Sequence, residues 1–386
     1  MLTRKLLMIP GPTPVTRTVQ NQMGRETAAF GDPNFVNTYR ELLLDLKTMW
    51  NAGGEVFVIS GSGTLAMEMA AANTLKTGDR LLLISHGYFG DRFAEMCRGK
   101  GIQVDTLSSS WGQTVSMKII EESLDSKSYQ ALAVTHVDTS TGVCAPLDEI
   151  GKLLKKRKKT LFIVDGVCAT AAEPEDMKEL GIDILLSGSQ KAFGVPPGLA
   201  MVWASAGALQ KREELGSIPE YYVDFQRWLP VMKDPSKYFA TPPVNMIWAM
   251  KEAVDIIKAE GLENRYRRHR ITAQAFQKAL ESLGFTHLAH PSCRAATLSN
   301  VIYPEGIEDA SFRKVLAEEG VVVAGGLGAY AGKMFRIGHM GNVEIHDLVA
   351  SLAAIERTLH RLDYPIIFGT GVGTFLNKLQ GEEEGS

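Results

Sequence analysis

The sequence predicts an α/β protein built on a largely parallel sheet, and three observations support this fold class. From about residue 55 onward, short apolar runs alternate with amphipathic helical stretches, which is typical of strands connected by covering helices. Polar and charged residues follow several of these runs directly. Beyond about residue 260 a shorter set of strands and helices follows, so we expect a large domain and a smaller C-terminal α/β domain.

The predicted strands of the large domain are short, mostly apolar runs. In chain order they cover residues 55–60, 80–85, 104–107, 131–137, 161–164, 182–186 and 199–203. Helices are expected at residues 64–75, in the segment that ends at residue 96, and at 146–158. The pattern predicts a mostly parallel, seven-stranded sheet with helices on both faces.

A long helical stretch from Val244 to Leu283 separates this pattern from the smaller one. The smaller unit has predicted strands at 296–302, 321–324 and 334–337 and helices at 309–319 and 345–362. We therefore divide the chain into an N-terminal segment (1–20), a large domain (21–260), a small domain (261–380) and a disordered tail (381–386).

The composition indicates a soluble globular protein. The chain has 386 residues, of which 45% are hydrophobic and 22% charged, and its net charge of −3 favours neither nucleic acid nor an anionic membrane as a partner. No stretch approaches a membrane span. The cysteines Cys97, Cys144, Cys168 and Cys293 are scattered without CxxC spacing, so we expect no disulfide framework, no metal site and a cytoplasmic location.

Lys191 is the most informative residue of the chain. It follows the predicted strand 182–186 and precedes a Pro-Pro-Gly turn within residues 187–198. A lysine held in a compact loop at a strand end can have its amine partly desolvated, which lowers its pKa and frees the lone pair that attacks an aldehyde. An ordinary surface lysine is the alternative interpretation.

Two other motifs are expected at the same sheet edge. Asp165 follows the predicted strand 161–164, where ligands of open parallel sheets bind, and its carboxylate could pair with a pyridine nitrogen or cap a helix. Residues 60–64, Ser-Gly-Ser-Gly-Thr, lie between a strand and a helix and form a plausible phosphate cradle. A plain capped helix is the alternative there.

Two more strand ends supply groups that suit a flat ring. The segment 85–90 brings aromatic side chains, which could stack on a ring or simply pack in the core. The segment 138–142, Asp-Thr-Ser-Thr-Gly, supplies hydroxyl groups at the same edge.

Together these motifs resemble the class V (fold type I) pyridoxal 5′-phosphate-dependent aminotransferases, in particular the alanine–glyoxylate and serine–pyruvate aminotransferase group. The resemblance extends from residues 10–14 to residues 335–341, and its most specific part is residues 187–198. It implies a homodimer with shared active sites. It also implies transfer of an amino group from alanine or serine to glyoxylate or pyruvate by a ping-pong mechanism through a Lys191 aldimine.

The resemblance also implies a role for each motif residue. Lys191 and Asp165 would be the catalytic residues, with Asp165 on the pyridine nitrogen. The other residues implied in cofactor binding are Ser62, Gly63, Thr64 and Gln190 at the phosphate, Phe89 and Val167 against the ring, Ser140 near the phenolic oxygen, and Tyr238 and Thr241 at the phosphate of the neighbouring subunit. Arg336 would clamp the substrate carboxylate, and Gly11 of the N-terminal segment would bring its backbone near the substrate.

The chain departs from the family pattern at two places. Thr64 replaces a histidine of some members, and residues 29–35 replace a His-Arg-Ser-Pro-Glu-Phe-like segment. No second arginine for a dicarboxylic substrate is obvious.

Two alternatives to transamination stay open. Cysteine desulfurases and related lyases carry a histidine before the lysine and a mobile cysteine, whereas Gln190 precedes Lys191 here and no cysteine lies in a convincing mobile loop. A lyase or desulfurase is therefore disfavoured. The second alternative is a non-catalytic relative that serves as an assembly subunit.

Overall fold

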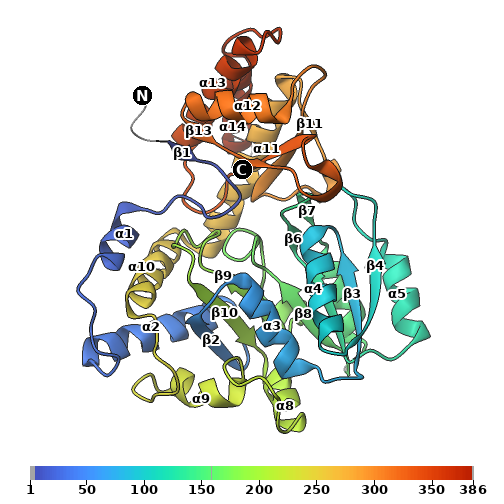
Figure 1. The fold of residues 1–386 in the computed structure, drawn as a ribbon, viewed down its shortest axis with the longest axis vertical. Coiled ribbons are helices and arrows are strands. Elements are labelled where there is room, and N and C mark those ends of the chain that lie inside the picture. The colour runs from blue at the N-terminus through green and yellow to red at the C-terminus, as the bar shows by residue number, and fades with distance from the viewer. Residues whose placement is uncertain (1–4, 158, 385–386) are drawn as a thin grey trace.

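The computed structural model describes residues 5–157 and 159–384. Figure 1 shows two lobes: the large sheet and its helices form the lower one, and the C-terminal strands and helices form the upper one. Strand β1 (Leu6–Leu7) lies in the upper lobe, where it pairs in parallel with β13 (Val321–Val322). The chain then descends to α1 (Arg17–Met23) beside the large sheet, so the N-terminal segment connects the two lobes.

The large sheet has seven strands in the order β2-β10-β9-β8-β5-β3-β4. Their bounds are Glu55–Ser60 (β2), Arg80–Ser85 (β3), Gln103–Ser108 (β4), Ala131–Thr135 (β5), Leu161–Asp165 (β8), Ile184–Gly188 (β9) and Leu199–Ala204 (β10). Only β10 runs antiparallel to its neighbours β2 and β9. The predicted mostly parallel, seven-stranded sheet is confirmed. Strands β5, β9 and β10 are buried along their whole length, as expected for apolar runs covered on both faces.

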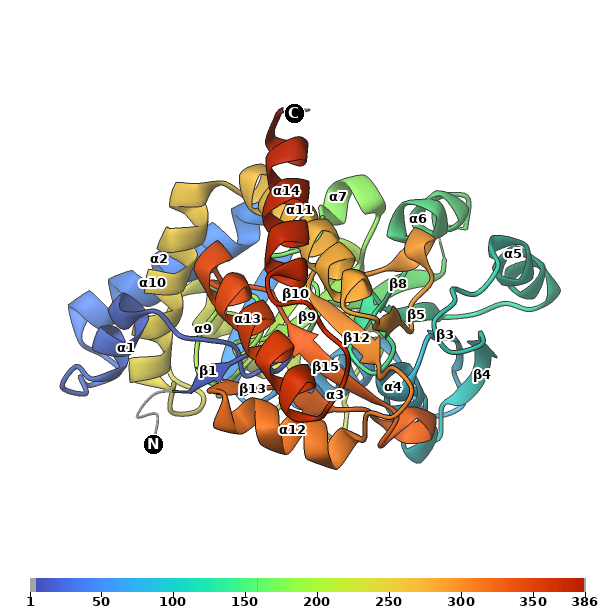
Figure 2. The ribbon, with the colours of Figure 1, turned by 90° about the horizontal axis from the view of Figure 1, so that it is seen from above.

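Helices cover both faces of this sheet, as Figure 2 shows for α3 and α4 on one side and α6 and α7 on the other. The helices of the large lobe are α2 (Pro33–Met49), α3 (Gly63–Thr74), α4 (Tyr88–Gly99), α5 (Met117–Ser126), α6 (Leu147–Lys155), α7 (Met177–Leu180), α8 (Ala206–Glu214), α9 (Phe225–Lys233) and α10 (Val244–Glu260). The strand pair β6 (Val137–Asp138) and β7 (Val143–Cys144) lies above the sheet edge.

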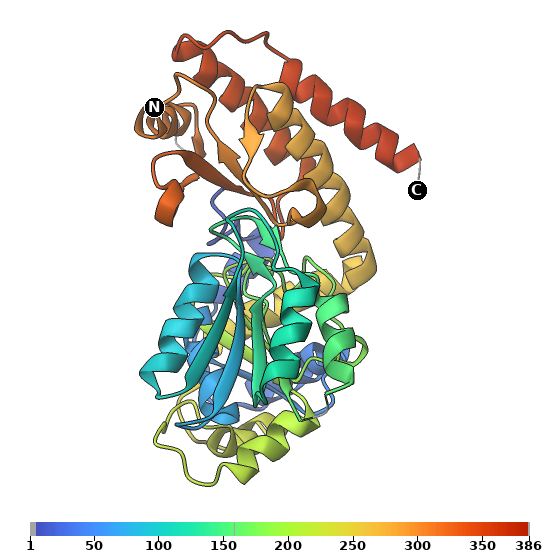
Figure 3. The ribbon, with the colours of Figure 1, turned by 90° about the vertical axis from the view of Figure 1, so that its right-hand side faces the viewer.

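The small lobe contains a four-stranded sheet in the order β11-β12-β15-β14. The bounds of these strands are Thr286–His287, Leu298–Ile302, Met334–Gly338 and Ala324–Gly325 in that order. Helices α11 (Leu262–Ser282) and α12 (Asp309–Glu318) contact this sheet, α13 (Ile345–Arg361) packs with both of them, and α14 (Thr370–Glu384) packs on α11 and α13 (Figure 3). Two 3₁₀ turns, Pro291–Cys293 and Gly328–Tyr330, complete the described elements of this lobe.

Two sequence-based expectations need correction. The single helical stretch from Val244 to Leu283 is two helices, because Gly261 adopts a positive φ of 79° that ends α10 and starts α11. The predicted tail at residues 381–386 is helical through Glu384, since buried Phe375 and Leu379 anchor α14 on the small lobe. Residues 385–386 lie outside the described residues.

Buried apolar side chains form two large clusters. One is made almost entirely of residues between Val19 and Ile257, and the other joins Met8 to residues between Ala275 and Leu379. We propose that these clusters mark the two domains, with the boundary near Gly261. None of the helices within residues 5–157 and 159–384 is both long and apolar enough to cross a membrane.

Candidate active site

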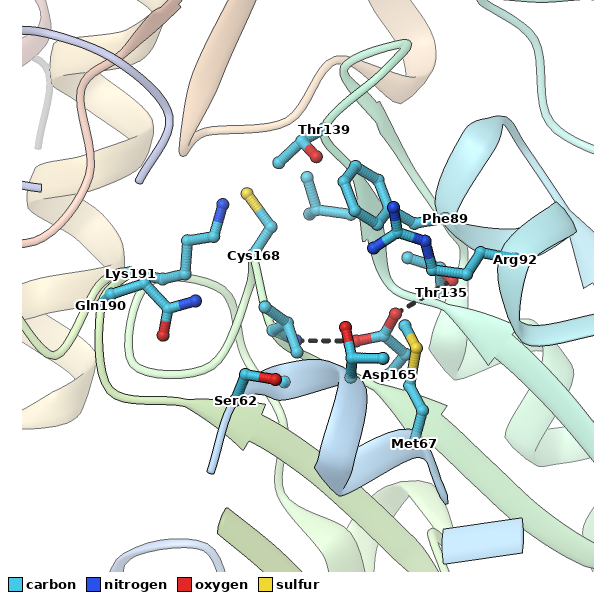
Figure 4. Close-up of a pocket in the computed structure, with 14 residues that line it drawn as sticks. Ser62, Met67, Phe89, Arg92, Thr135, Thr139, Asp165, Cys168, Gln190 and Lys191 are labelled. Atoms are coloured by element: carbon cyan, nitrogen blue, oxygen red, sulfur yellow. Dashed lines mark hydrogen bonds between the residues drawn. The ribbon is translucent and has the colours of Figure 1, made fainter. Parts of the chain in front are cut away.

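A cavity of about 170 Å³ lies where the carboxyl ends of β5 and β8 meet the start of α3 and the loop after β9. The carboxyl edge of a parallel sheet is the usual ligand site of this architecture. Figure 4 shows side chains from all these elements around it. The predicted residues that line the cavity are Ser62, Gly63, Thr64, Phe89, Asp165, Val167, Gln190 and Lys191.

Lys191 reaches the cavity from the loop that follows β9. Its Nζ donates a hydrogen bond to the carbonyl of Pro10, and the Thr13 hydroxyl donates to the Lys191 carbonyl at 2.7 Å. Burial lowers the pKa of the Lys191 amine below its ordinary value, and the nearby Arg336 guanidinium acts in the same direction. The amine is therefore held by the N-terminal segment in a site that favours its neutral form.

Gly11 packs directly against this lysine. Its φ is +102°, and a Cβ at this position would lie 2.4 Å from Lys191 Cδ. Only glycine combines this backbone conformation with so close an approach. The backbone of Gly11 in the N-terminal segment therefore lies against the Lys191 side chain.

Asp165 is the last residue of β8 and is 1% exposed. Its carboxylate accepts hydrogen bonds from the Val167 amide at 3.0 Å and the Thr135 hydroxyl at 3.2 Å, drawn as dashed lines in Figure 4. Thr135 is its register partner on β5. Burial outweighs these bonds and raises the pKa of Asp165 to about 7. A hydrogen-bond donor or a positive charge bound in the cavity would therefore stabilise the ionised form of this carboxyl group.

The raised pKa predicts a measurable pH dependence of stability. With the cavity empty, the folded protein binds the Asp165 proton more tightly than the unfolded chain does, because the carboxyl pKa changes from 3.8 to about 7 on folding. The free energy of unfolding should therefore fall as the pH rises through this window. Asp165→Asn has no titrating carboxyl at this position, so it lacks this pH-dependent loss of stability. The melting temperature of the cofactor-free variant minus that of the cofactor-free wild type should therefore increase from pH 4 to pH 7. Parallel melting curves at every pH would contradict this account.

The start of α3 presents free backbone donors to the cavity. Ser62 is its N-cap but makes no side-chain capping bond, and its first turn contains no acidic residue. A Cβ at Gly63 would lie 2.7 Å from Val167 Cγ2, so the helix start packs tightly on the loop after β8. The Gln190 side chain also lines the cavity, and its NH₂ group is a hydrogen-bond donor. The helix start and this donor are suited to an anion such as a phosphate.

Phe89 and Val167 supply the apolar walls. Phe89 comes from the first turn of α4, where the carboxylate of Asp138 accepts a hydrogen bond from its amide at 3.1 Å. Ser140 does not line the cavity: its hydroxyl donates to Asp138 at 2.6 Å and accepts from the Tyr88 amide at 2.9 Å. In this structure Ser140 fixes the start of α4 and thereby the position of Phe89.

The remaining predicted residues lie outside the cavity lining. Arg336 is on β15 of the small lobe, where its Nε donates to the Gly325 carbonyl at 2.7 Å. Tyr238 and Thr241 lie in the segment between α9 and α10, and their hydroxyl oxygens are 3.3 Å apart. Tyr238 is 57% exposed, and its ring lies 4.9 Å from that of Phe30. The two residues thus form part of an open surface of the single chain.

The structure adds six residues to the predicted lining of the cavity: Met67, Arg92, Thr135, Val137, Thr139 and Cys168. Thr135 holds Asp165, and Arg92 lies over the Phe89 ring with its Cζ 5.2 Å from the ring centre. Cys168 lies beside Lys191 (Figure 4), and burial raises its thiol pKa to about 11, so the thiol is neutral. The sequence offered one signal for Cys168: it follows Asp165, a predicted site residue, by three positions. Arg92 thus brings a guanidinium group into the cavity lining, which the sequence had not indicated.

The sheet topology and the lysine and carboxylate at its edge define a protein of fold type I, the architecture of pyridoxal phosphate-dependent transferases. The chain belongs to the class V aminotransferase family, whose model matches residues 18–344.

Its curated relatives include aminotransferases and proteins named as hydrogenase subunits. The chain is 34% identical to alanine–glyoxylate aminotransferase 1 of Saccharomyces cerevisiae, over 87% of this chain and 91% of that protein. It is 31% identical to serine–glyoxylate aminotransferase of Arabidopsis thaliana, over 98% and 96%. It is also 32% identical to the soluble hydrogenase 42 kDa subunit of Anabaena cylindrica, over 95% and 96%.

A solved structure extends the likeness to the whole fold. Ureidoglycine–glyoxylate aminotransferase from Bacillus subtilis superposes with a TM-score of 0.92 at 26% identity, over 98% of this chain and 99% of that one. The similarity therefore covers both lobes.

Proposed function

We propose that this protein is a pyridoxal 5′-phosphate-dependent aminotransferase that moves the amino group of a small amino acid to a small 2-oxo acid. The observation that carries the proposal is the placement of a desolvated lysine amine and a buried carboxylate in one cavity at the sheet edge. The names of the yeast and Arabidopsis relatives support alanine or serine as the donor and glyoxylate as an acceptor.

The residues of the cavity fit this cofactor. The free N-terminus of α3 and the NH₂ group of the Gln190 side chain suit its phosphate, and Phe89 and Val167 suit the two faces of its ring. Asp165, buried and without a cationic partner in the described residues, suits a protonated ring nitrogen. When bound, pyridoxal phosphate supplies an aldehyde that holds amines and a ring that accepts the electron pair left at a substrate carbon.

Each protein group then has a defined task. Asp165 keeps the ring nitrogen protonated, and Thr135 and Val167 hold its carboxylate in place. Lys191 would bind the cofactor's aldehyde, and its free amine would move the proton at the substrate Cα. Its lowered pKa favours the neutral amine that this proton transfer requires. Donor and acceptor would use the same cavity in turn, which gives a ping-pong order.

Substrate tests separate transamination from its rivals. A panel of alanine, serine and aspartate against glyoxylate, pyruvate and 2-oxoglutarate should show continuous turnover only when both a donor and an acceptor are present; a donor alone should give no more than one equivalent of 2-oxo acid per active site. Small pairs should give the highest kcat/KM. Ammonia or sulfide release without an acceptor would instead favour the lyase or desulfurase alternative, for which Cys168 offers only a neutral, buried thiol.

We also propose that the active protein is a homodimer. Tyr238 and Thr241 lie on an exposed surface with Phe30. The family resemblance implies that these two residues bind the cofactor phosphate in the active site of the neighbouring subunit. Diluting the protein below its dimer dissociation constant should release pyridoxal phosphate, and Tyr238→Phe with Thr241→Val should weaken its retention at high concentration. A monomer that retains the cofactor as tightly as the dimer would contradict this assignment.

The assembly-subunit alternative has specific support in the hydrogenase subunit name of the Anabaena relative. The presence of Lys191, Asp165 and Arg336 favours an enzyme, since a purely structural subunit needs none of them. We place the enzyme in the cytoplasm, in agreement with its four free cysteines.

A further inference from the structure

Trp111 connects the two lobes through an aromatic contact. It lies in the segment between β4 and α5 of the large lobe, and its ring stacks on that of Tyr330 in the small lobe, with ring centres 5.5 Å apart and planes 20° from parallel. Gly328 packs on the indole, since a Cβ there would lie 2.7 Å from Trp111 Cη2. Tyr330 and Gly328 belong to the hairpin loop (residues 326–333) that connects β14 to β15, the strand of Arg336. The proposed function gives this contact no role.

The hairpin loop is conformationally permissive. Strand β14, which leads into it, is an edge strand with two register pairs, both to β15. Glycine occupies positions 326, 328 and 332 of the loop and position 325 before it, and glycine loses more conformational freedom on ordering than any other residue. Contacts from outside therefore favour the observed conformation of such a segment. The Trp111 ring supplies one of these contacts from the opposite lobe.

The orientation of Arg336 depends on the start of this loop. The Gly325 carbonyl, directly before the loop, accepts the hydrogen bond from Arg336 Nε at 2.7 Å. Among the described residues, neither terminal nitrogen of this guanidinium has a hydrogen-bond or ion-pair partner. Burial and, in addition, the nearby guanidinium lower the pKa of the Lys191 amine, so the guanidinium lies near the candidate active site. Both terminal nitrogens are thus free to bind a carboxylate there.

The segment that carries Trp111 is fixed from both lobes. On the small-lobe side, Gly112 has a φ of +86°, and its carbonyl accepts a hydrogen bond from the His290 amide at 2.8 Å. On the large-lobe side, the Val115 amide donates a hydrogen bond to His86 Nε2 at 3.3 Å. His86 directly follows β3 at the carboxyl edge of the large sheet. The indole therefore has a defined position relative to the sheet edge and can fix the position of the hairpin loop.

We infer that Trp111 is a positioning residue for the substrate carboxylate. By stacking on Tyr330 it holds the hairpin loop, so that the Gly325 carbonyl keeps the Arg336 guanidinium oriented for binding. When the stack is lost, only a fraction of the molecules holds the guanidinium in place, and the apparent affinity for the carboxylate falls by that fraction. The inference rests on the proposed aminotransferase function, with Arg336 as the carboxylate clamp.

Steady-state kinetics of the cofactor-loaded protein test this role. Trp111→Ala should raise KM for the amino donor and for the 2-oxo acid about 2- to 12-fold, the effect of losing one aromatic pair, with kcat nearly unchanged. Trp111→Phe keeps a ring and should recover most of the affinity. In an Arg336→Ala background, Trp111→Ala should raise KM no further, because the group that Trp111 positions is absent.

The matched control is Phe368→Ala. This variant removes an exposed aromatic ring of the small lobe whose centre lies 5.2 Å from that of His360, and it should leave both KM values unchanged. Tyr330→Ala removes the other ring of the stack and should give the same KM shift as Trp111→Ala. It covers the case in which Trp111→Ala misfolds, as judged by circular dichroism.

Limited digestion with trypsin tests the anchoring of the loop without relying on catalysis. Lys333 is exposed at the end of the hairpin loop. Because cleavage follows the population of the opened segment, Trp111→Ala and Tyr330→Ala should each be cut after Lys333 severalfold faster than the wild type, as measured by mass spectrometry. Phe368→Ala should be cut at the wild-type rate.

Three results would overturn the inference and leave the aminotransferase assignment intact. They are unchanged KM values in folded, active Trp111→Ala and Tyr330→Ala proteins, an equal KM shift from Trp111→Ala with and without Arg336, and cleavage after Lys333 at the wild-type rate in both variants. A wild type that transaminates no donor and acceptor pair would instead refute the proposed function, and this inference with it.

Discussion

Replacement of Lys191 by alanine should abolish both transamination and the covalent retention of pyridoxal phosphate. Proton transfer by a positioned group is worth about 10²–10⁴-fold in rate, and the variant also loses the amine that holds the cofactor. We therefore expect kcat to fall by at least this factor. Borohydride reduction of the wild type, followed by peptide mapping, should place the reduced cofactor on the peptide that contains Lys191.

The control for this experiment is Lys118→Ala, since Lys118 lies on the exposed face of α5 with a side chain 83% exposed. This variant should keep both the activity and the labelled peptide. A Lys191→Ala protein that still traps the cofactor after reduction would assign the reactive amine to another residue.

Replacement of Arg336 by alanine should raise KM for the amino donor with a much smaller effect on kcat. An unpaired substrate carboxylate loses a charge-assisted hydrogen bond of about 1.5–3 kcal/mol, which corresponds to about a 10- to 150-fold rise in KM. Arg336→Lys should recover only part of the loss, because an ammonium group lacks the bidentate fork of a guanidinium.

Two controls separate this effect from damage to the small lobe. Arg336 donates to the Gly325 carbonyl on β14, so the melting temperature of each variant must be measured alongside KM. Arg357→Ala removes an exposed arginine that pairs with Glu319 at 2.6 Å and should leave KM unchanged. An unchanged KM in a folded Arg336→Ala protein would move the carboxylate clamp elsewhere, and Arg92 would be the next candidate.

The sequence predicted the large sheet well because its strands are continuous apolar runs. Runs such as 55–60 and 80–85 coincide with β2 and β3, since burial on both faces leaves little ambiguity about their extent. The helix break at Gly261 and the C-terminal helix α14 were missed. A single glycine within a helical pattern is a weak signal, and α14 depends on tertiary packing of Phe375 and Leu379.

The candidate site could be predicted only where a motif directly follows a strand. Lys191, Asp165 and Ser62 do so, and the carboxyl ends of parallel strands bring them together. Thr135 reaches Asp165 through the pairing register of β5 with β8, and Arg92 reaches the cavity from the second turn of α4. Such contacts depend on three-dimensional placement, which residue spacing along the chain does not specify.

A single-turnover reaction with the amino donor alone tests the central proposal most directly. Cofactor-loaded protein mixed with its best donor, without any acceptor, should release one equivalent of the corresponding 2-oxo acid per active site and no ammonia. Addition of glyoxylate should then release one equivalent of glycine and restore the original absorbance spectrum. Continuous turnover with ammonia release, or no spectral change with any amino acid, would contradict the assignment as an aminotransferase.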